Sequence, residues 1–322
     1  MERVNRQGIC GLYNFGNTCY LNSIIQTLNS SKYFIKKIVE EDLLEYKEKN
    51  IESTLTFEIK KLFTGIWKDN CIIVPESLVN KLQKLLKIRI NYQHDVDEFL
   101  EIILNKISEE LCKELNIRIE GDVKNELDKV YLLSLKSWEK SFKKDYSFIT
   151  ELFYGQYYSE IICLNCNHKT CSYDPFMILE LELKYDNILD CIKEHTSFEE
   201  DIDDYKCEEC EKKNIKKRLN IIKLPKILLI TLKRYNNRIC KLSNDININT
   251  DLKLRDYLGN VYNYNLKSII MHEGSCMGGH YYTYTKNIKT NKWFNFNDEK
   301  VSEIEDIKDV NKQNIYSLLY EL

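Results

Sequence analysis

Residues 11–28, "GLYNFGNTCYLNSIIQTL", join a loop with two glycines to the start of a helix. After the cysteine, apolar residues recur at the i, i+3, i+4 and i+7 spacing of one helical face, at Leu21, Ile24, Ile25 and Leu28. Asn17 or Thr18 can cap this helix, so Cys19 falls in its first turn, where free N–H groups and the macrodipole favour a thiolate. The stretch predicts either a nucleophile or a small core residue, and alone it favours the core residue.

The composition indicates a globular protein with a sizeable core. The chain has 322 residues, 43% of them apolar, and a net charge of -3. The near balance of charge disfavours nucleic acid as a partner. The longest apolar run, about Ile227–Leu232, is too short to span a membrane, and the first residues lack the apolar core of a signal peptide. We expect a soluble monomer in the cytoplasm or also the nucleus, where 12 cysteines suggest thiol or metal chemistry.

A predicted hairpin near the other end of the chain carries a histidine. In "GGHYYTYTKNIKTNKWFNFND", residues 278–298, two aromatic and β-branched runs flank a polar turn. A hairpin folded about residues 288 and 289 sets His280 opposite Asn297, whose amide would then orient the imidazole. Asp298 would face the other side unless a bulge intervenes. The paired glycines Gly278 and Gly279 favour this interpretation over a plain surface histidine, because they indicate a close backbone approach.

Two CxxC pairs, separated by residues 167–206, indicate a metal site. Four thiolates suit tetrahedral zinc, and each CxxC turn presents two of them. The spacing exceeds that of a compact zinc ribbon, so we expect the turns to meet at the tip of a longer β excursion. A redox pair or a coincidence is the alternative, and His168 or Cys171 could replace a ligand. The predicted ligands of this structural zinc are Cys163, Cys166, Cys207 and Cys210.

A third pattern, "NYQHDVDEFLEIILNKISEEL" at residues 91–111, predicts an amphipathic helix with a D-x-x-E cap formed by Asp95 and Glu98. Its apolar face holds Val96, Phe99, Leu100, Ile103, Ile107 and Leu111. The spacing explains a core helix and leaves open whether the polar residues at its start also contact a ligand.

These stretches, in this order, resemble the ubiquitin-specific proteases, a family of papain-like cysteine deubiquitinases. "GLYNFGNTCYLNSIIQTL" is similar to the family's Cys box, "NYQHDVDEFL" to its Q-[QH]-D-x-x-E-[FL] segment, and "GGHYYTYTK…WFNFND" to its His box. "LFYGQYYSEIICLNCNHKT" and "YKCEECEKK" are similar to its zinc finger hairpins, and "LPKILLITLKRY" to the strand that follows them. The likeness spans about residues 7–300 and implies an α+β fold with a helical thumb, a β palm and zinc-binding β fingers.

The resemblance implies a role for each matching residue. Cys19 would be the nucleophile, His280 the general base and Asn297 the third residue, where many relatives have Asp. Asn14 would bind the oxyanion, and Asp298 would support the oxyanion or the histidine. Asp95 would grip the extended ubiquitin tail, which carries arginines. The residues expected beside that tail also include Gln93, Glu98, Gly279 and Tyr281.

The resemblance also implies one catalytic domain over 1–322, with a thumb at about 1–150, fingers and the start of the palm at 151–235, and the rest of the palm at 236–322. Residues 112–150 match no motif beyond a generic helical pattern, and residues 236–257 are rich in Asn where the family has a Phe-Pro segment. Three alternatives stay open: a protease for a ubiquitin-like modifier, a non-catalytic ubiquitin binder, and a zinc-ribbon nucleic-acid binder. The acidic "EEDIDDYKCEEC" disfavours the last.

Overall fold

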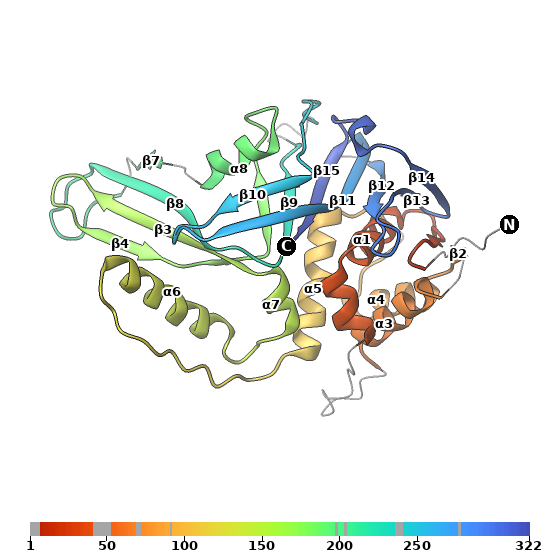
Figure 1. Ribbon diagram of the computed structural model, residues 1–322, viewed down its shortest axis with the longest axis horizontal. Helices are drawn as coiled ribbons and strands as arrows, with labels where there is room; N and C mark the ends of the chain where they lie inside the picture. The colour runs from red at the N-terminus through yellow and green to blue at the C-terminus, as the bar shows by residue number, and fades with distance from the viewer. Residues whose placement is uncertain are drawn as a thin grey trace.

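The computed structural model describes residues 7–40, 53–68, 72–90, 92–196, 199–202, 205–235, 241–275 and 278–322. Helices from residues 19–111 gather at one side of a large sheet, and a second sheet extends away from it (Figure 1). Residues 1–6, part of the Asn-rich segment (236–240) and part of the glycine-bearing loop (276–277) lie outside the described residues. None of the helices within these ranges is long and apolar enough to cross a membrane.

The helical side is built around α1, in which all 11 residues are buried. The predicted amphipathic helix is α5, and each residue of its predicted apolar face is buried, so this prediction is confirmed. The helices are α1 (Cys19–Asn29), α2 (Lys32–Ile35), a π-helical turn η1 (Lys36–Glu40), α3 (Leu55–Ile66), α4 (Glu76–Leu86), α5 (Val96–Leu111), α6 (Glu126–Phe142), α7 (Phe148–Phe153), α8 (Ile188–Thr196) and a 3-10 turn η4 (Ile307–Asp309).

The large sheet has eight strands in the order β14-β13-β12-β11-β15-β9-β6, with β10 also paired to β11. It is antiparallel except for β6, which runs parallel to β9. Its strands are β6 (Ile178–Leu181), β9 (Ile227–Leu232), β10 (Asp251–Arg255), β11 (Val261–Ser275), β12 (Gly278–Lys286), β13 (Trp293–Asn297), β14 (Lys300–Ile304) and β15 (Ile315–Glu321). A separate parallel pair joins β1 (Gly11–Leu12) to β2 (Ile72–Ile73).

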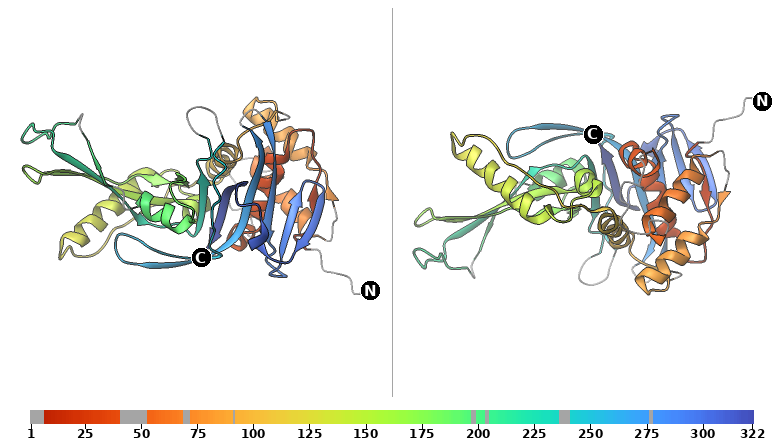
Figure 2. Two further views of the ribbon diagram at one scale, coloured as in Figure 1. Left: turned by 90° about the horizontal axis from the view of Figure 1, so that it is seen from above. Right: turned by 90° about the horizontal axis from the view of Figure 1, so that it is seen from below.

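The second sheet forms an arm that projects from the body (Figure 2). It contains β3 (Gly155–Cys163), β4 (Lys169–Ser172), β5 (Pro175–Phe176), β7 (Glu199–Asp201) and β8 (Ile215–Lys223). Helix α6, from the segment without a motif, packs against this sheet, where Lys223 Nζ lies 3.1 Å from the centre of the Trp138 ring. The predicted boundaries at residues 150 and 235 stay a prediction, and α6 shows that the first range also supplies a layer of the arm.

Buried polar side chains on α1 fix the start of the chain beside it. Gln26 Nε2 donates to Cys10 O at 2.7 Å, and Asn29 Nδ2 donates to Gly8 O at 3.0 Å. Together with Asn22 these residues follow an i, i+4, i+7 spacing, so they form one polar stripe along the helix. Because a buried amide without a partner is costly, this stripe holds the chain leading to Cys19 in one place.

Candidate active site

The two ends of the chain meet at the N-terminus of α1. Helix α1 packs against β12 and β13, so the Cys box and the His box lie side by side (Figure 1). Cys19 is the first residue of α1 and is buried, with 4% of its surface exposed. Its side chain lies close enough to that of His280, on β12, to raise the pKa of the imidazole. Residues separated by most of the chain therefore form a thiol–imidazole pair.

His280 is oriented by an amide on its other side. His280 Nε2 lies 2.7 Å from Asn297 Oδ1, whereas Asp298 Oδ2 is 3.9 Å away. The interaction with Cys19, the hydrogen bond with Asn297 and the charge of Asp298 together raise the pKa of His280 to about 9, against the opposing effect of burial. The imidazole is therefore protonated near neutral pH and can pair with a thiolate.

The predicted pairing of His280 with Asn297 is wrong by two residues. The β12–β13 ladder pairs Thr283 with Phe296, so Asn297 is level with residue 282 and lies diagonally from His280. The turn causes the shift: Asn287 Oδ1 accepts from the amides of residues 289 and 290, and Asn291 adopts a left-handed φ of 58°. These contacts centre the turn one residue later than a symmetric fold. A shift of two residues keeps the same sheet face, so the two side chains still meet.

Asp298 departs from the expected strand geometry. It lies in the tight turn between β13 and β14 with a φ of 53°, so strand alternation does not decide where it points. Its carboxylate accepts from Asn14 Nδ2 and from Asn22 Nδ2, each at 2.8 Å. Asp298 therefore joins the loop before α1 to α1 itself, and the turn also accepts a backbone bond from Leu12. A Cβ on Gly11 would overlap the Glu299 carbonyl, which explains that glycine.

The amide of Asn14 is held in one orientation. Asn14 Oδ1 accepts from Thr18 N at 3.0 Å and from Thr18 Oγ1 at 3.1 Å, while Nδ2 donates to Asp298. The Nδ2 group has a second proton, for which the described residues provide no hydrogen-bond acceptor. An oriented donor beside the first turn of α1, with the free N–H groups of that turn, is suited to binding an oxyanion.

A cavity of about 410 Å³ opens between the start of α5 and the palm strands. Asp95 caps α5 through bonds to the amides of Asp97 and Glu98, and it also accepts from Tyr316 OH. Asp97 is 7% exposed, and neither carboxylate oxygen has a well-formed hydrogen bond to a described residue. Burial, with the nearby charge of Asp95, raises the pKa of Asp97 to about 8. Five acidic and two basic side chains line this cavity, which we call the acidic channel: Asp95, Asp97, Glu98, Glu101, Glu180, Lys233 and Arg234, together with Ile178, Thr231, Leu232, Tyr235 and Tyr316.

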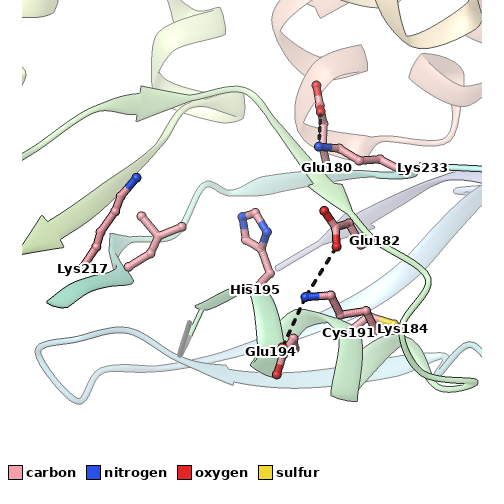
Figure 3. Close-up of a pocket in the computed structure, with 9 residues that line it drawn as sticks. Glu180, Glu182, Lys184, Cys191, Glu194, His195, Lys217 and Lys233 are labelled. Atoms are coloured by element: carbon pink, nitrogen blue, oxygen red, sulfur yellow. Dashed lines mark hydrogen bonds and ion pairs between the residues drawn. The ribbon is translucent and has the colours of Figure 1, made fainter. Parts of the chain in front are cut away.

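A neighbouring pocket of about 230 Å³ shares Glu180 and Lys233 with the acidic channel but balances its own charges (Figure 3). Lys184 lies 3.5 Å from both Glu182 and Glu194, and Lys233 lies 3.2 Å from Glu180. The pocket has three acidic and three basic side chains, whereas the acidic channel has five acidic and two basic ones, so the pocket attracts a basic peptide less than the acidic channel does.

The four predicted ligand cysteines meet at the tip of the arm. Their sulfur atoms all lie within 4.8 Å of one another, and the Cys163–Cys210 and Cys166–Cys207 pairs are each 3.5 Å apart. The knuckles have matching backbones: Asn167 N donates to Cys163 O and Glu211 N to Cys207 O, both at 2.9 Å. The cluster can hold a metal ion. In the described part of the chain, neither His168 nor Cys171 belongs to it.

Comparison with known proteins agrees with this geometry. The profile of the family described as "Ubiquitin carboxyl-terminal hydrolase" matches residues 10–320. The chain belongs to this family. Human ubiquitin carboxyl-terminal hydrolase 2 is 31% identical over 346 residues, which cover 100% of this chain and 56% of the human protein. A probable ubiquitin carboxyl-terminal hydrolase of Acanthamoeba polyphaga mimivirus is 28% identical, over 98% of this chain and 90% of that protein.

Solved structures share the fold of this family member. The Ubp8–Sgf11–Sgf73–Sus1 SAGA DUB module has a TM-score of 0.75 at 25% identity and covers 98% of this chain and 68% of that chain. The Ubp8 module bound to ubiquitin aldehyde has a TM-score of 0.76 at 24% identity, over 99% of this chain and 70% of that chain. The predicted α+β fold is confirmed. The chain spans little more than half the length of the human relative.

Sequence patterns missed two contributors to the site. Asn22, which fixes Asp298, lies on an apolar helix, and the polar stripe it begins is the signal that points to it. Tyr316, which bonds Asp95, comes from a buried strand with no motif around it, so no local signal finds it.

Proposed function

We propose that this chain is a thiol-dependent deubiquitinase that hydrolyses the bond after the C-terminal glycine of ubiquitin. The observation that carries the proposal is the Cys19–His280–Asn297 arrangement beside the acidic channel. Membership of the ubiquitin carboxyl-terminal hydrolase family supports it. The substrate is a ubiquitin conjugate whose basic, extended tail passes along the acidic channel to Cys19.

The proposed reaction begins with the thiolate of Cys19 attacking the glycine carbonyl. The resulting oxyanion is stabilised by Asn14 Nδ2 and by backbone N–H groups at the start of α1, and losing such a donor costs about 2.7–4 kcal/mol. Protonated His280 gives its proton to the departing lysine amine. Water, deprotonated by His280, then releases ubiquitin from the thioester and restores Cys19.

The four-cysteine cluster is proposed as a structural zinc site. Tetrahedral coordination with Zn–S bonds of about 2.3 Å separates the sulfurs by about 3.8 Å. The two 3.5 Å pairs within a cluster spanning 4.8 Å fit that arrangement with little movement. Four protein thiolates would leave no open position for substrate, so the ion would fix the arm and take no part in the reaction.

The test is release of a fluorophore from the C-terminus of ubiquitin by the purified chain. We expect turnover by the native chain and none by Cys19→Ala, which keeps the fold but lacks the sulfur. Parallel probes made from ubiquitin-like modifiers identify the modifier that is accepted. A folded, metal-loaded sample that turns over none of these probes would contradict the proposal and favour a non-catalytic ubiquitin binder.

A further inference from the structure

An exposed apolar patch lies on the short pair of parallel strands at the start of the Cys box. In this pair Leu12 is level with Ile73, and both side chains pack on the core. Because side chains alternate between the two faces of a strand, the residues on either side of Ile73 point outward. Ile72 and Val74 are 54% and 56% exposed, and Tyr13, which follows Leu12, is 44% exposed. We call these three exposed residues, Tyr13, Ile72 and Val74, the β1–β2 patch.

The β1–β2 patch adjoins the proposed oxyanion donor. Tyr13 and Phe15 flank Asn14 along the chain, and their rings meet edge to face with centroids 5.1 Å apart. Gly11 lies two residues before Tyr13 and so on the same face of the strand, where a Cβ would meet the carbonyl of Glu299. The patch therefore borders both the loop that holds Asn14 and the turn between β13 and β14.

The order of the large sheet sets the β1–β2 patch and the acidic channel on opposite sides of His280. The channel is lined by the start of α5 and by β6, β9 and β15, which lie toward one end of the sheet order. The patch adjoins the turn between β13 and β14 at the other end, and β12, which carries His280, lies between the two ends. Helix α1, which begins with Cys19, likewise lies between α5 and β2 (Figure 1).

We propose that the β1–β2 patch binds apolar residues that flank the modified lysine on the protein from which ubiquitin is removed. The inference rests on the proposed function. In that reaction the ubiquitin tail lies in the acidic channel, so the part of the substrate beyond the scissile bond continues on the other side of Cys19, where the patch lies. Apolar side chains of the acceptor protein would cover Ile72 and Val74 and remove them from water, which favours binding.

The experiment compares two substrates in which ubiquitin is joined to the lysine of a short peptide. One peptide has leucine and phenylalanine beside the lysine, and the other has serine at both places. The variant combines Ile72→Thr with Val74→Thr, which keeps β-branched residues in the strand and leaves Ile73 on the core. Val261→Thr, at an exposed residue at the start of β11, is the matched control.

We expect the native chain and Val261→Thr to prefer the apolar peptide by at least about five-fold in kcat/KM, and the double variant to lose this preference. Turnover of the serine peptide should be the same in all three proteins. Equal kcat/KM for both peptides in the native chain, or an equal loss for both in the double variant, overturns the inference. A native dimer that the double variant dissociates would also overturn it, because the patch would then bind a second copy of the chain.

Binding to Cys19→Ala separates this inference from the proposed function. Calorimetry with that variant measures the affinity of both substrates without turnover, and the apolar one should bind at least about five-fold more tightly. If the native chain turns over neither substrate but this difference in affinity is present and disappears with Ile72→Thr and Val74→Thr, the proposed function fails while the docking site stands. Equal affinities overturn the inference whether or not the chain is active.

Discussion

The tip of the arm and the Cys19–His280 site both bring cysteine side chains together with other reactive groups, but they are built in opposite ways. At the tip, each short CxxC turn supplies two of the four sulfurs. The two turns are held by equivalent backbone hydrogen bonds. In the cleft, Cys19 and His280 come from opposite ends of the chain and meet where a helix packs on a sheet. A short turn positions its cysteines through its own backbone. The relative position of Cys19 and His280, in contrast, depends on how α1 packs on the large sheet.

The largest expected effect breaks the tip of the arm. Cys166→Ser removes one of the four proposed zinc ligands, so we expect loss of zinc binding and a large loss of stability, because a structural zinc contributes on the order of 10 kcal/mol. Metal analysis and thermal unfolding measure both. Cys171→Ser is the matched control, because Cys171 lies on β4 outside the cluster and should leave the zinc content unchanged. Equal metal content in both variants would argue against the four-cysteine site.

The second largest effect comes from removing the hydrogen bonds by which Asp298 joins the two ends of the chain beside Cys19. In Asp298→Asn the left-handed turn is kept, because Asn tolerates positive φ, but one acceptor oxygen becomes a donor. The amides of Asn14 and Asn22 then cannot both be satisfied. We expect kcat to fall by about 10²-fold and the unfolding temperature to fall as well, because one of the two amides loses its acceptor. Glu303→Gln, an exposed acidic residue on β14, is the control and should keep the native kcat. An equal loss of kcat in both variants would show that Asp298 has no specific role in the site.

A smaller effect separates orientation from chemistry. Asn297→Ala removes the acceptor 2.7 Å from His280 Nε2, so the imidazole loses its fixed orientation but keeps its proton-transfer role. We expect kcat to fall by roughly 10-fold, well short of the complete loss in Cys19→Ala. Asn297→Asp keeps the acceptor and adds charge, and it should retain at least native activity. Complete loss in Asn297→Ala would contradict this division of roles.

The smallest effect is a shift in the pH profile. Because the pKa of His280 is raised to about 9, the imidazolium persists through neutral pH, and kcat/KM should fall only as the pH rises through about 9. The bond with Asn297 contributes to the raised pKa, so in Asn297→Ala this fall should begin at lower pH. Stopped-time assays across pH 6–10 on both proteins measure it. A fall at the same pH in both would show that Asn297 does not influence the imidazole.

Much of the fold follows from local patterns. The i, i+3, i+4 spacing after Cys19 and in residues 96–111 gives α1 and α5, and the aromatic runs around the polar turn give β12 and β13. Residue patterns could not predict the register of that hairpin, because hydrogen bonds of the Asn287 side chain inside the turn determine it. A symmetric fold ignores such bonds and misplaces Asn297 by two residues.

Sequence alone also indicated which thiols pair into knuckles, since a CxxC turn carries its own geometry. Only the tertiary structure decided how far Asp298 lies from His280, that Asp298 joins Asn14 to Asn22, and that Gln93 reaches Gly279. Each of these contacts joins segments distant along the chain, and none is implied by the spacing within either segment. The periodicity of apolar residues indicates which face of a helix or strand is buried. Which distant residue a side chain contacts depends on the packing of the whole molecule.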